Sequence, residues 1–269
     1  KNINFIQSKQ NNNLSSIFDA LVLGVKDYTK KCGFKSVLIG LSGGIDSALV
    51  TTIATAALGN DNVFCVSMPS PWSTEHSIID AKELVRRLNI NFEMMPIHNL
   101  MNSYENTLID NLNCKPTGVT SENIQSRIRG TLLMALANQN KHLLLSTGNK
   151  SELAVGYCTL YGDMNGGLSV IGDLYKTNVF KLCRWIDSKD SIKTRAKYKL
   201  KFNEKIIGEN ISNKPPSAEL GPDQLDSDSL TPYSELDAIL KGIIEERKEV
   251  SQLEQEGHVL TRQLDKLQH

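Results

Sequence analysis

Residues 40–47 are Gly40-Leu41-Ser42-Gly43-Gly44-Ile45-Asp46-Ser47, directly after the apolar run Val37-Leu38-Ile39 and before a helical pattern of apolar residues. This order predicts a buried strand, a glycine-rich turn and the start of a helix. The two adjacent glycines allow the backbone to turn with φ > 0 and to aim N–H groups at an anion. The helix N-terminus adds unpaired donors and partial positive charge. We therefore predict that this turn binds phosphate.

Several kinds of glycine turn compete for this stretch. A Walker A loop would carry a lysine after its last glycine, where this chain has Ile45. Residues 40–44 also fit the G-x-S-x-G elbow of α/β hydrolases, but too little chain precedes Ser42 for the earlier strands of that fold. The pattern Ser-Gly-Gly-x-Asp-Ser resembles the pyrophosphate loop of ATP pyrophosphatases, which cleave ATP between its α and β phosphates. For these eight residues taken alone, a glycine turn that binds no ligand remains an alternative interpretation.

Composition and charge set broad limits on the function. The chain has 269 residues, of which 40% are hydrophobic and 22% charged, as is usual for a globular protein. Its formal net charge is zero, so no overall field draws it to nucleic acid or to an anionic membrane. It begins at Lys1 without a signal-peptide pattern. We expect a cytoplasmic piece or processed form of a longer protein that binds neither nucleic acid nor membrane.

The cysteines and histidines show no metal-ligand spacing. The five cysteines are scattered and none belongs to a C-x-x-C pair, which favours reduced thiols over disulfides or zinc. The five histidines are equally dispersed. A transition-metal site is therefore not expected.

Apolar runs alternate with helical patterns through the first half of the chain. Strands are expected near 36–39, 63–68, 92–97 and 143–146. Helices are expected near 16–32, 45–58, 74–88, 104–108 and 120–138. This alternation predicts an α/β fold with a doubly wound parallel sheet flanked by helices and joined by right-handed crossovers. Residues 1–13 are polar and are expected to form a flexible segment before a single domain over 14–269.

The second half of the chain is expected to be mainly helical. Helices are predicted near 174–186 and 233–248, with further C-terminal helix up to residue 269. Between them, 188–205 carries seven Lys or Arg residues and is interpreted as a basic insertion that forms a solvated loop. Residues 210–232 contain several prolines and acidic residues, which favours a mobile loop of the kind that covers binding sites.

A second phosphate-binding turn is expected after the strand at 143–146. In open parallel sheets, ligands bind at the carboxyl ends of strands where the winding direction reverses. If this strand lies beside the strand before Ser42, a nucleotide fits between Ser42 and Thr147. Asp46 and Glu152 would then be the carboxylates closest to the phosphates, and such a pair suits Mg²⁺. Taken singly, Asp46 could be a helix first-turn acid and Glu152 a surface charge.

Two further polar groups accompany these turns. Asn123, Arg127 and Gly130 share one face of the helix predicted at 120–138. Helix capping plus an exposed arginine would explain that face equally well. Lys176 could stabilise charge on a leaving pyrophosphate, or could simply start a helix.

Six short motifs follow one another along the chain. They are GLSGGIDS at 40–47, ENIQSRIRG at 122–130, STGNKSE at 146–152, YGD at 161–163, YKT at 175–177 and PPSAEL at 215–220. In this order they resemble NAD⁺ synthetase, and specifically the synthetase domain of the glutamine-dependent bacterial enzyme. The resemblance spans roughly residues 17–240. It implies a five-stranded sheet of the adenine nucleotide alpha hydrolase-like fold, followed by a helical C-terminal part.

The resemblance also implies a ligase reaction in two steps. The nicotinate carboxylate of deamido-NAD⁺ attacks the α-phosphate of ATP and releases pyrophosphate, and ammonia then displaces AMP to form the amide. Mg²⁺ is the implied cofactor and ATP the co-substrate. The implied assembly is a homodimer or higher homo-oligomer that completes the dinucleotide site across its interface.

Roles are carried over only to the positions that match the motifs. By similarity, residues 40–47, Thr147, Lys176 and Ser217 would bind ATP, with Asp46 and Lys176 as the catalytic pair. Asp46 and Glu152 would bind Mg²⁺. The contacts to deamido-NAD⁺ would be Asn123, Arg127, Glu152 and Asp163.

The chain departs from the family pattern in three respects. A glutaminase domain is expected upstream and is not in this sequence, so ammonia would come from solution or, through glutamine, from a missing part. A basic Tyr-Lys-Arg segment that follows the last helix in the family is not present before the chain stops at His269. The insertion at 188–205 is longer and more basic than the family pattern.

Three other functions stay open from the sequence. A GMP-synthetase-like amidating enzyme would share the pyrophosphate loop. A tRNA thiolase would require catalytic cysteines and a basic face, and neither is evident. A nucleotide-binding module without catalysis often lacks the acidic residues, whereas Asp46 and Glu152 are both present.

Overall fold

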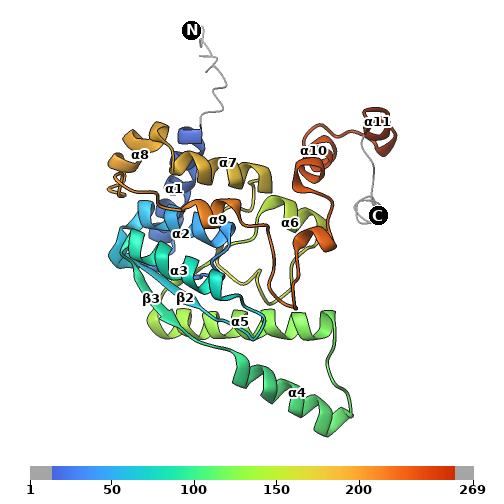
Figure 1. The fold of residues 1–269 in the computed structure, drawn as a ribbon. Coiled ribbons are helices and arrows are strands. Elements are labelled where there is room, and N and C mark those ends of the chain that lie inside the picture. The colour runs from blue at the N-terminus through green and yellow to red at the C-terminus, as the bar shows by residue number, and fades with distance from the viewer. Residues whose placement is uncertain (1–13, 258–269) are drawn as a thin grey trace.

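Residues 14–257 are described by the computed structural model, in which a sheet lies between layers of helices (Figure 1). The predicted flexible segment 1–13 and the last predicted helical residues, 258–269, lie outside the described residues. The strands are β1 (Val37–Gly40), β2 (Val63–Ser67), β3 (Asn91–Met94), β4 (Leu143–Ser146) and β5 (Leu168–Ser169).

The sheet has five strands in the order β3-β2-β1-β4-β5, and every pair in it is parallel. The predicted doubly wound parallel sheet is therefore confirmed. β1 pairs with β2 on one side and with β4 on the other, so the direction of winding reverses between β1 and β4. Polar groups that follow these two strands consequently meet at one edge of the sheet.

Helices connect the strands and continue beyond the sheet. They are α1 (Leu14–Lys31), α2 (Ile45–Leu58), α3 (Glu75–Leu88), α4 (His98–Leu112), α5 (Val119–Asn140), α6 (Lys150–Val155), α7 (Lys176–Ile186), α8 (Ile192–Lys197), α9 (Glu209–Asn213), α10 (Tyr233–Ile244) and α11 (Val250–Gln255). Short 3₁₀ turns occur at η1 (Asn60–Asn62), η2 (Lys189–Ser191) and η3 (Asp226–Asp228).

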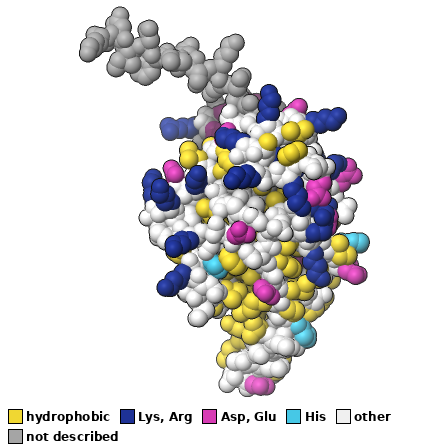
Figure 2. Space-filling model, turned by 90° about the vertical axis from the view of Figure 1, so that its left-hand side faces the viewer, with side chains coloured by type: hydrophobic (Ala, Val, Ile, Leu, Met, Phe, Trp, Pro, Cys, Tyr) yellow, Lys and Arg dark blue, Asp and Glu magenta, His cyan; other side chains and the backbone are white. Residues whose placement is uncertain are grey.

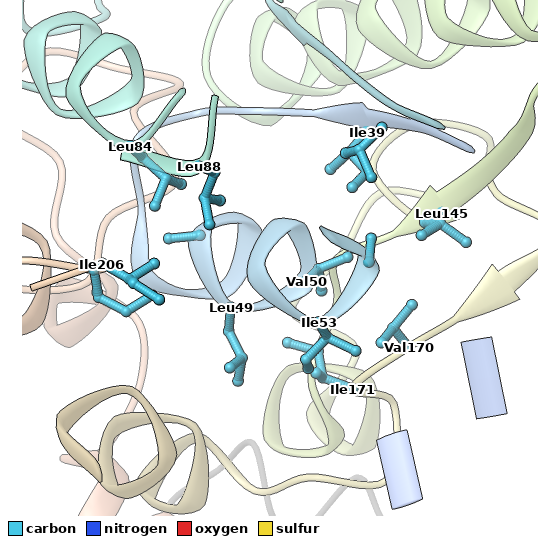
Figure 3. Close-up of a cluster of buried hydrophobic side chains, with 14 of the residues drawn as sticks. Ile39, Leu49, Val50, Ile53, Leu84, Leu88, Leu145, Val170, Ile171 and Ile206 are labelled. Carbon is cyan, nitrogen blue, oxygen red and sulfur yellow. The ribbon is translucent and has the colours of Figure 1, made fainter. Parts of the chain in front are cut away.

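Alternate residues of β1, β2 and β4 face two separate cores. In β1, Val37 and Ile39 pack into the larger core, which also contains side chains of α1, α2, α3 and α7 (Figure 3). Leu38 points the other way, into a smaller core beneath α5 that includes Ile128. α2 is buried around most of its circumference because it lies between the sheet and the α1–α7 layer. This double burial explains why both faces of β1 are apolar.

Several element boundaries differ from the predictions. The weak helix expected near 104–108 is part of the longer α4, and the helix expected over 233–248 ends at Ile244 and is followed by α11. A fifth strand was expected, but the sequence did not show where it lies. β5 has only two residues, which are too few to form a pattern of alternation. It is defined by its pairing, which places Leu168 beside Leu145 of β4.

The basic segment 188–205 is not a solvated loop, so that interpretation was wrong. It contains α8, and the Arg195 side chain is only 3% exposed. The guanidinium donates to the carbonyl of Ile186 (3.2 Å) and, through Nε, to that of Lys201 (2.7 Å). The hydroxyl of Tyr198 donates to Asp19 of α1 (2.7 Å). The lysines point outward from a segment whose other side packs on α1, which the count of charges alone could not reveal.

The predicted mobile loop 210–232 begins within α9 and ends at α10. Apart from α9 and η3 it has no regular structure, and its mobility stays a prediction. In residues 14–257, no helix combines the length and the apolar composition needed to cross a membrane.

Candidate functional site

A cavity of about 290 Å³ opens at the carboxyl ends of β1, β2 and β4. The loops that follow these strands contribute Ser42, Pro69 and Thr147 to its wall. The predicted convergence of Ser42 and Thr147 is therefore confirmed. α5 and the segment 214–226 complete the wall. Its size and its position at the reversal of winding suit a small ligand bound across two turns.

The glycine turn after β1 packs directly against α3. Gly43 has φ +85°, and a Cβ built on it would lie 2.1 Å from the carbonyl oxygen of Ser77. Gly44 has φ −86°, so only one of the two glycines uses the left-handed conformation that was expected of the pair. The Ser42 hydroxyl accepts from the Gly44 N–H (3.1 Å) and lies 3.1 Å from the Ser47 hydroxyl. The turn thus places backbone donors and two hydroxyls at the N-terminus of α2.

Lys176 lies between the two carboxylates that were predicted to bind metal. Its Nζ donates to Oδ2 of Asp46 at 2.6 Å and to Oε1 of Glu152 at 2.9 Å. The lysine is only 2% exposed. Burial alone would lower the pKa of Lys176, but Asp46 and Glu152 raise it well above its usual value. Burial and the nearby Asp46 charge raise the pKa of Glu152 to about 7.

A network from three helices fixes the backbone at Lys176. The Ser151 hydroxyl of α6 accepts from the Lys176 N–H (2.8 Å) and donates to Oδ1 of Asp237 (2.5 Å). The other oxygen of Asp237 accepts from the Thr177 N–H (2.8 Å). Asp237 of α10 therefore satisfies a free donor at the start of α7, where a carboxylate is favoured by the helix dipole.

Asn149 connects the two turns that were predicted to bind phosphate. Its side-chain amide donates to Oδ1 of Asp46 (3.0 Å), and its Oδ1 accepts from the Glu152 N–H (3.1 Å). In turn, Oε2 of Glu152 accepts a hydrogen bond from the Asn149 N–H (3.3 Å), which completes a capping box at the start of α6. This reciprocal cap orients the Glu152 carboxylate toward Lys176.

The donor set fits Mg²⁺ in kind and in number. Asp46 and Glu152 supply two carboxylates in the first turns of two helices, beside a turn suited to phosphate, and Mg²⁺ is commonly bound by one or two carboxylates together with phosphate oxygens. Lys176 Nζ occupies the position between them in this structure. Within residues 14–257, no group of three or more His, Cys, Asp or Glu side chains could form a metal site without a ligand's help.

The four predicted contacts to the second substrate do not all line the cavity. Glu152 and Asp163 do, whereas Asn123 and Arg127 lie behind the turn at 157–163. Asn123 Oδ1 accepts from the Thr159 hydroxyl (2.8 Å), and Arg127 Nε donates to the Leu160 carbonyl (3.2 Å).

Asp163 belongs to the same turn. Its carboxylate accepts from the Thr159 N–H (3.0 Å) and from the Ser126 hydroxyl of α5 (3.1 Å). The predicted polar face of α5 therefore supports the turn that carries Asp163.

The segment 214–228 contributes to the wall of the cavity and is fixed to α3. Lys214 forms an ion pair with Asp80 (2.5 Å). The Glu219 carboxylate accepts from the hydroxyls of Ser77 (2.5 Å) and Thr74 (3.1 Å). Ser217, which was predicted to bind ATP, lies between these two attachments and lines the cavity. We call residues 214–228 the strap.

Sequence reasoning missed three residues that shape the site: Asn149, Asp237 and Arg129. The spacing of Asn149 and Glu152 is itself a capping-box signal and could have identified Asn149. Asp237 carries no local signal because its partners lie on α6 and α7. Arg129 of α5 lines the cavity, and in the sequence it had been noted only as part of the motif at 122–130, without a role.

Known proteins are similar to this chain over most of its length. The NAD synthase family model matches residues 17–269. The glutamine-dependent NAD(+) synthetase of Synechocystis is 53% identical over 232 residues, which are 86% of this chain and 39% of that protein. The enzyme of the same name from Thermotoga maritima is 47% identical over 90% of this chain and 40% of its own length. The chain therefore spans about two fifths of the length of these relatives.

Solved structures give the same picture. The chain resembles the glutamine-dependent NAD⁺ synthetase of Acinetobacter baumannii in complex with ADP, with a TM-score of 0.68, 39% identity and coverage of 94% of this chain and 43% of that one. It also resembles an NMN synthetase from Francisella tularensis, with a TM-score of 0.73, 25% identity and coverage of 94% and 91%.

Proposed function

The chain belongs to the NAD synthase family, and from this premise we propose that it converts deamido-NAD⁺ to NAD⁺ with ATP and ammonia. ATP would activate the nicotinate carboxylate as an adenylate with release of pyrophosphate. Ammonia would then displace AMP. The observation that carries this proposal is the 53% identity to a glutamine-dependent NAD(+) synthetase across the region that contains both phosphate-binding turns.

The cavity supports the first step by positioning. A carboxylate becomes an acyl donor only after it carries a good leaving group, so the enzyme must bring it in line with the α-phosphate of ATP. The turn at 40–47 and Thr147 supply backbone and hydroxyl donors to the wall of the cavity, and Ser217 of the strap also lines it. These groups suit the binding of ATP, with its phosphates next to the N-terminus of α2.

Lys176 and the two carboxylates would change partners when ATP binds. Mg²⁺, when bound with ATP, would neutralise phosphate charge, and Asp46 and Glu152 are the residues that would hold it. The Lys176 ammonium would then be released from at least one carboxylate. A buried cation beside the departing pyrophosphate stabilises the charge that develops on it. We therefore assign Asp46 and Lys176 the central role in adenylation.

The second substrate would lie against the turn at 157–163. Asp163 and Glu152 line the cavity on that side, and Asn123 and Arg127 support the turn from α5. Contacts from Asn123 and Arg127 to deamido-NAD⁺ would require their present bonds to Thr159 and Leu160 to change.

A homodimer would explain the apolar surface of α4. None of the residues of α4 is buried, although Leu100, Tyr104 and Leu112 lie along it, and Leu112 is 68% exposed. Hydrophobic side chains gather on the lower half of the face shown in Figure 2, and α4 extends from this end of the molecule (Figure 1). We propose that a second copy of the chain packs here, because single apolar side chains at the surface are ordinary whereas a row of them along one helix indicates a partner.

The nitrogen source would depend on the rest of the protein. The chain spans about two fifths of its glutamine-dependent relatives, so we propose that it uses free ammonia by itself and glutamine-derived ammonia when joined to a glutaminase domain. The protein would act in the cytoplasm, where ATP is available and where its five free cysteines stay reduced.

Turnover by the purified chain tests the proposal. With ATP, Mg²⁺, deamido-NAD⁺ and ammonium, we expect NAD⁺, AMP and pyrophosphate in equal amounts. Release of ADP, or turnover of xanthosine monophosphate in place of deamido-NAD⁺, would contradict it. Nicotinate mononucleotide should be included as a substrate, because the NMN synthetase matches over almost its whole length. A preference for the mononucleotide would favour that second function.

A further inference from the structure

Arg129 lies on α5 and lines the cavity, where it is half-buried. Its Nε donates to the carbonyl of Met68 at 3.0 Å, just beyond the end of β2. Arg127, two residues earlier, is exposed and faces the Leu160 carbonyl instead. Residues two apart on a helix point in different directions, so these two arginines serve different surroundings.

Among the cations of the cavity wall in residues 14–257, Arg129 is the one that forms no ion pair. The cavity is lined by three cations, Arg129, Lys176 and Lys214. Lys176 is paired with two carboxylates, and Lys214 with Asp80. Arg129 has no carboxylate within 4 Å among residues 14–257, and its Nη atoms hydrogen-bond to no acceptor in that part of the chain. Burial lowers the pKa of Arg129 to about 10, with Glu219 opposing this shift.

A half-buried cation without an ion pair loses solvation at a cost in stability, and a ligand anion can offset that cost. The guanidinium is well suited to that purpose because its two Nη atoms can bind two oxygens of one phosphate while Nε stays on Met68. An arginine in this position is therefore a site for an anion that enters the cavity.

The lining of the cavity indicates which anion. Its β2 end is apolar, formed by Val66, Met68, Pro69, Ile78 and Leu133, and suits a nucleobase. The glycine turn at the β1 end suits the terminal phosphates. In a nucleoside triphosphate that spans the two ends, the α-phosphate lies nearest the base. Arg129, which is bonded to Met68, is the cation at that end.

We propose that Arg129 binds the α-phosphate of ATP. The identity of the ligand rests on the proposed function. The α-phosphate is the group that the carboxylate attacks, and it is retained in the adenylate and in AMP. One guanidinium would accordingly contact the reacting phosphorus group through both steps, while Lys176 serves the departing pyrophosphate. The two cations would thus contact different phosphates of the same ATP molecule.

Binding of nucleotide fragments tests this assignment without any turnover. Isothermal titration would compare AMP, adenosine and pyrophosphate, all without Mg²⁺, on the wild type and on Arg129→Met. We expect the wild type to bind AMP more tightly than adenosine. Arg129→Met should lose about 10- to 100-fold in AMP affinity, the range for a hydrogen-bonded charge, and less than about threefold in adenosine affinity. Pyrophosphate affinity should be unchanged.

Two further variants keep the result interpretable. Arg129→Lys retains the charge but loses the bidentate geometry, so its AMP affinity should lie between those of the wild type and Arg129→Met. It also decides the matter if Arg129→Met does not fold. Arg86→Met, at a surface ion pair on α3, is the matched control and should bind all three ligands normally.

Each contrary result overturns the assignment. Equal losses for adenosine and AMP would mean that Arg129 only shapes the pocket through Met68. A selective loss of pyrophosphate would move the arginine to the terminal phosphates, and unchanged AMP affinity would remove it from binding. Because deamido-NAD⁺ takes no part, these outcomes are independent of whether the protein makes NAD⁺.

Discussion

The Lys176 ammonium lies 2.6 Å from Oδ2 of Asp46, although 130 residues separate the two in the chain. The contact joins the N-terminus of α7 to that of α2, so the two sides of the cavity share one buried charge pair. Glu152 contacts the same nitrogen from α6. A ligand that takes over the Lys176 ammonium must therefore change the contacts of both carboxylates.

Asp46→Asn should abolish adenylation and leave the fold intact. Lys176 would keep its contact to Glu152, and the amide can still meet Asn149, so no buried charge becomes unpaired. We expect ATP–pyrophosphate exchange to fall by at least about 100-fold, with little change in the melting temperature. Asp19→Asn removes a similar contact to a lysine on the surface and is the control. Near-normal exchange in Asp46→Asn would contradict the metal and catalytic assignment.

Gly43→Ala should destabilise the protein and impair ATP binding. The new methyl group would meet the carbonyl of Ser77 and would also force alanine into φ +85°. We expect a loss of about 3 kcal/mol in the free energy of unfolding by urea. Gly33→Ala separates the two causes, because Gly33 has φ +77° but no atom within 4 Å of the added Cβ. That control should lose only about 1 kcal/mol, and equal losses in both variants would disprove the close packing of the turn.

Glu219→Gln should loosen the strap. The Glu219 carboxylate accepts from three donors at the start of α3, and an amide NH₂ cannot accept, so at least one contact is lost. We expect faster hydrogen exchange in residues 214–228 and a KM for ATP raised about 2- to 10-fold. The exposed Glu93 of β3 provides the control substitution Glu93→Gln. Exchange in the strap that matches the wild type would show that Glu219 does not fix it.

Leu112→Asp should dissociate the proposed dimer. A carboxylate in an apolar interface is strongly unfavourable, whereas the same change at a free surface is nearly neutral. Light scattering after gel filtration should show the wild type as a dimer and the variant as a monomer. Leu23→Asp on α1, where the leucine is 56% exposed, tests an apolar side chain outside the α4 surface. A dimer that survives Leu112→Asp would place the interface elsewhere.

Acid should weaken the fold through His142. Burial lowers the pKa of this histidine below its ordinary value of 6.5. The unfolded chain therefore binds a proton at His142 near pH 6.5, whereas the folded chain binds it only at lower pH. The free energy of unfolding consequently falls as the pH drops below 6.5. The ring stacks on Phe64 with centroids 4.4 Å apart, so His142→Phe keeps the packing. The shift in urea midpoint between about pH 7.5 and about pH 5.5 should be smaller in this variant, and an unchanged shift would exclude His142 as its source.

Short apolar runs and glycine turns made much of the fold predictable. β4 was predicted with its observed bounds, and α2 with its observed end at Leu58, because a strand buried on both faces is continuously apolar and Gly59 follows the helix. β5 and α6 escaped prediction because they span two and six residues. α8 escaped because lysines on its outer side masked the buried Arg195.

The residue types at the site followed from local motifs, since a glycine turn between a strand and a helix has its own phosphate-binding geometry. Their arrangement required the folded chain. Pairing of β1 with β4 brings the turns at Ser42 and Thr147 together, and packing of α7 against α6 and α10 places Lys176 on Asp46 and Glu152. A motif extends over a few residues, whereas these contacts join segments up to 130 residues apart. Backbone conformation was encoded locally, and the balance of charge in the cavity arose only from long-range packing.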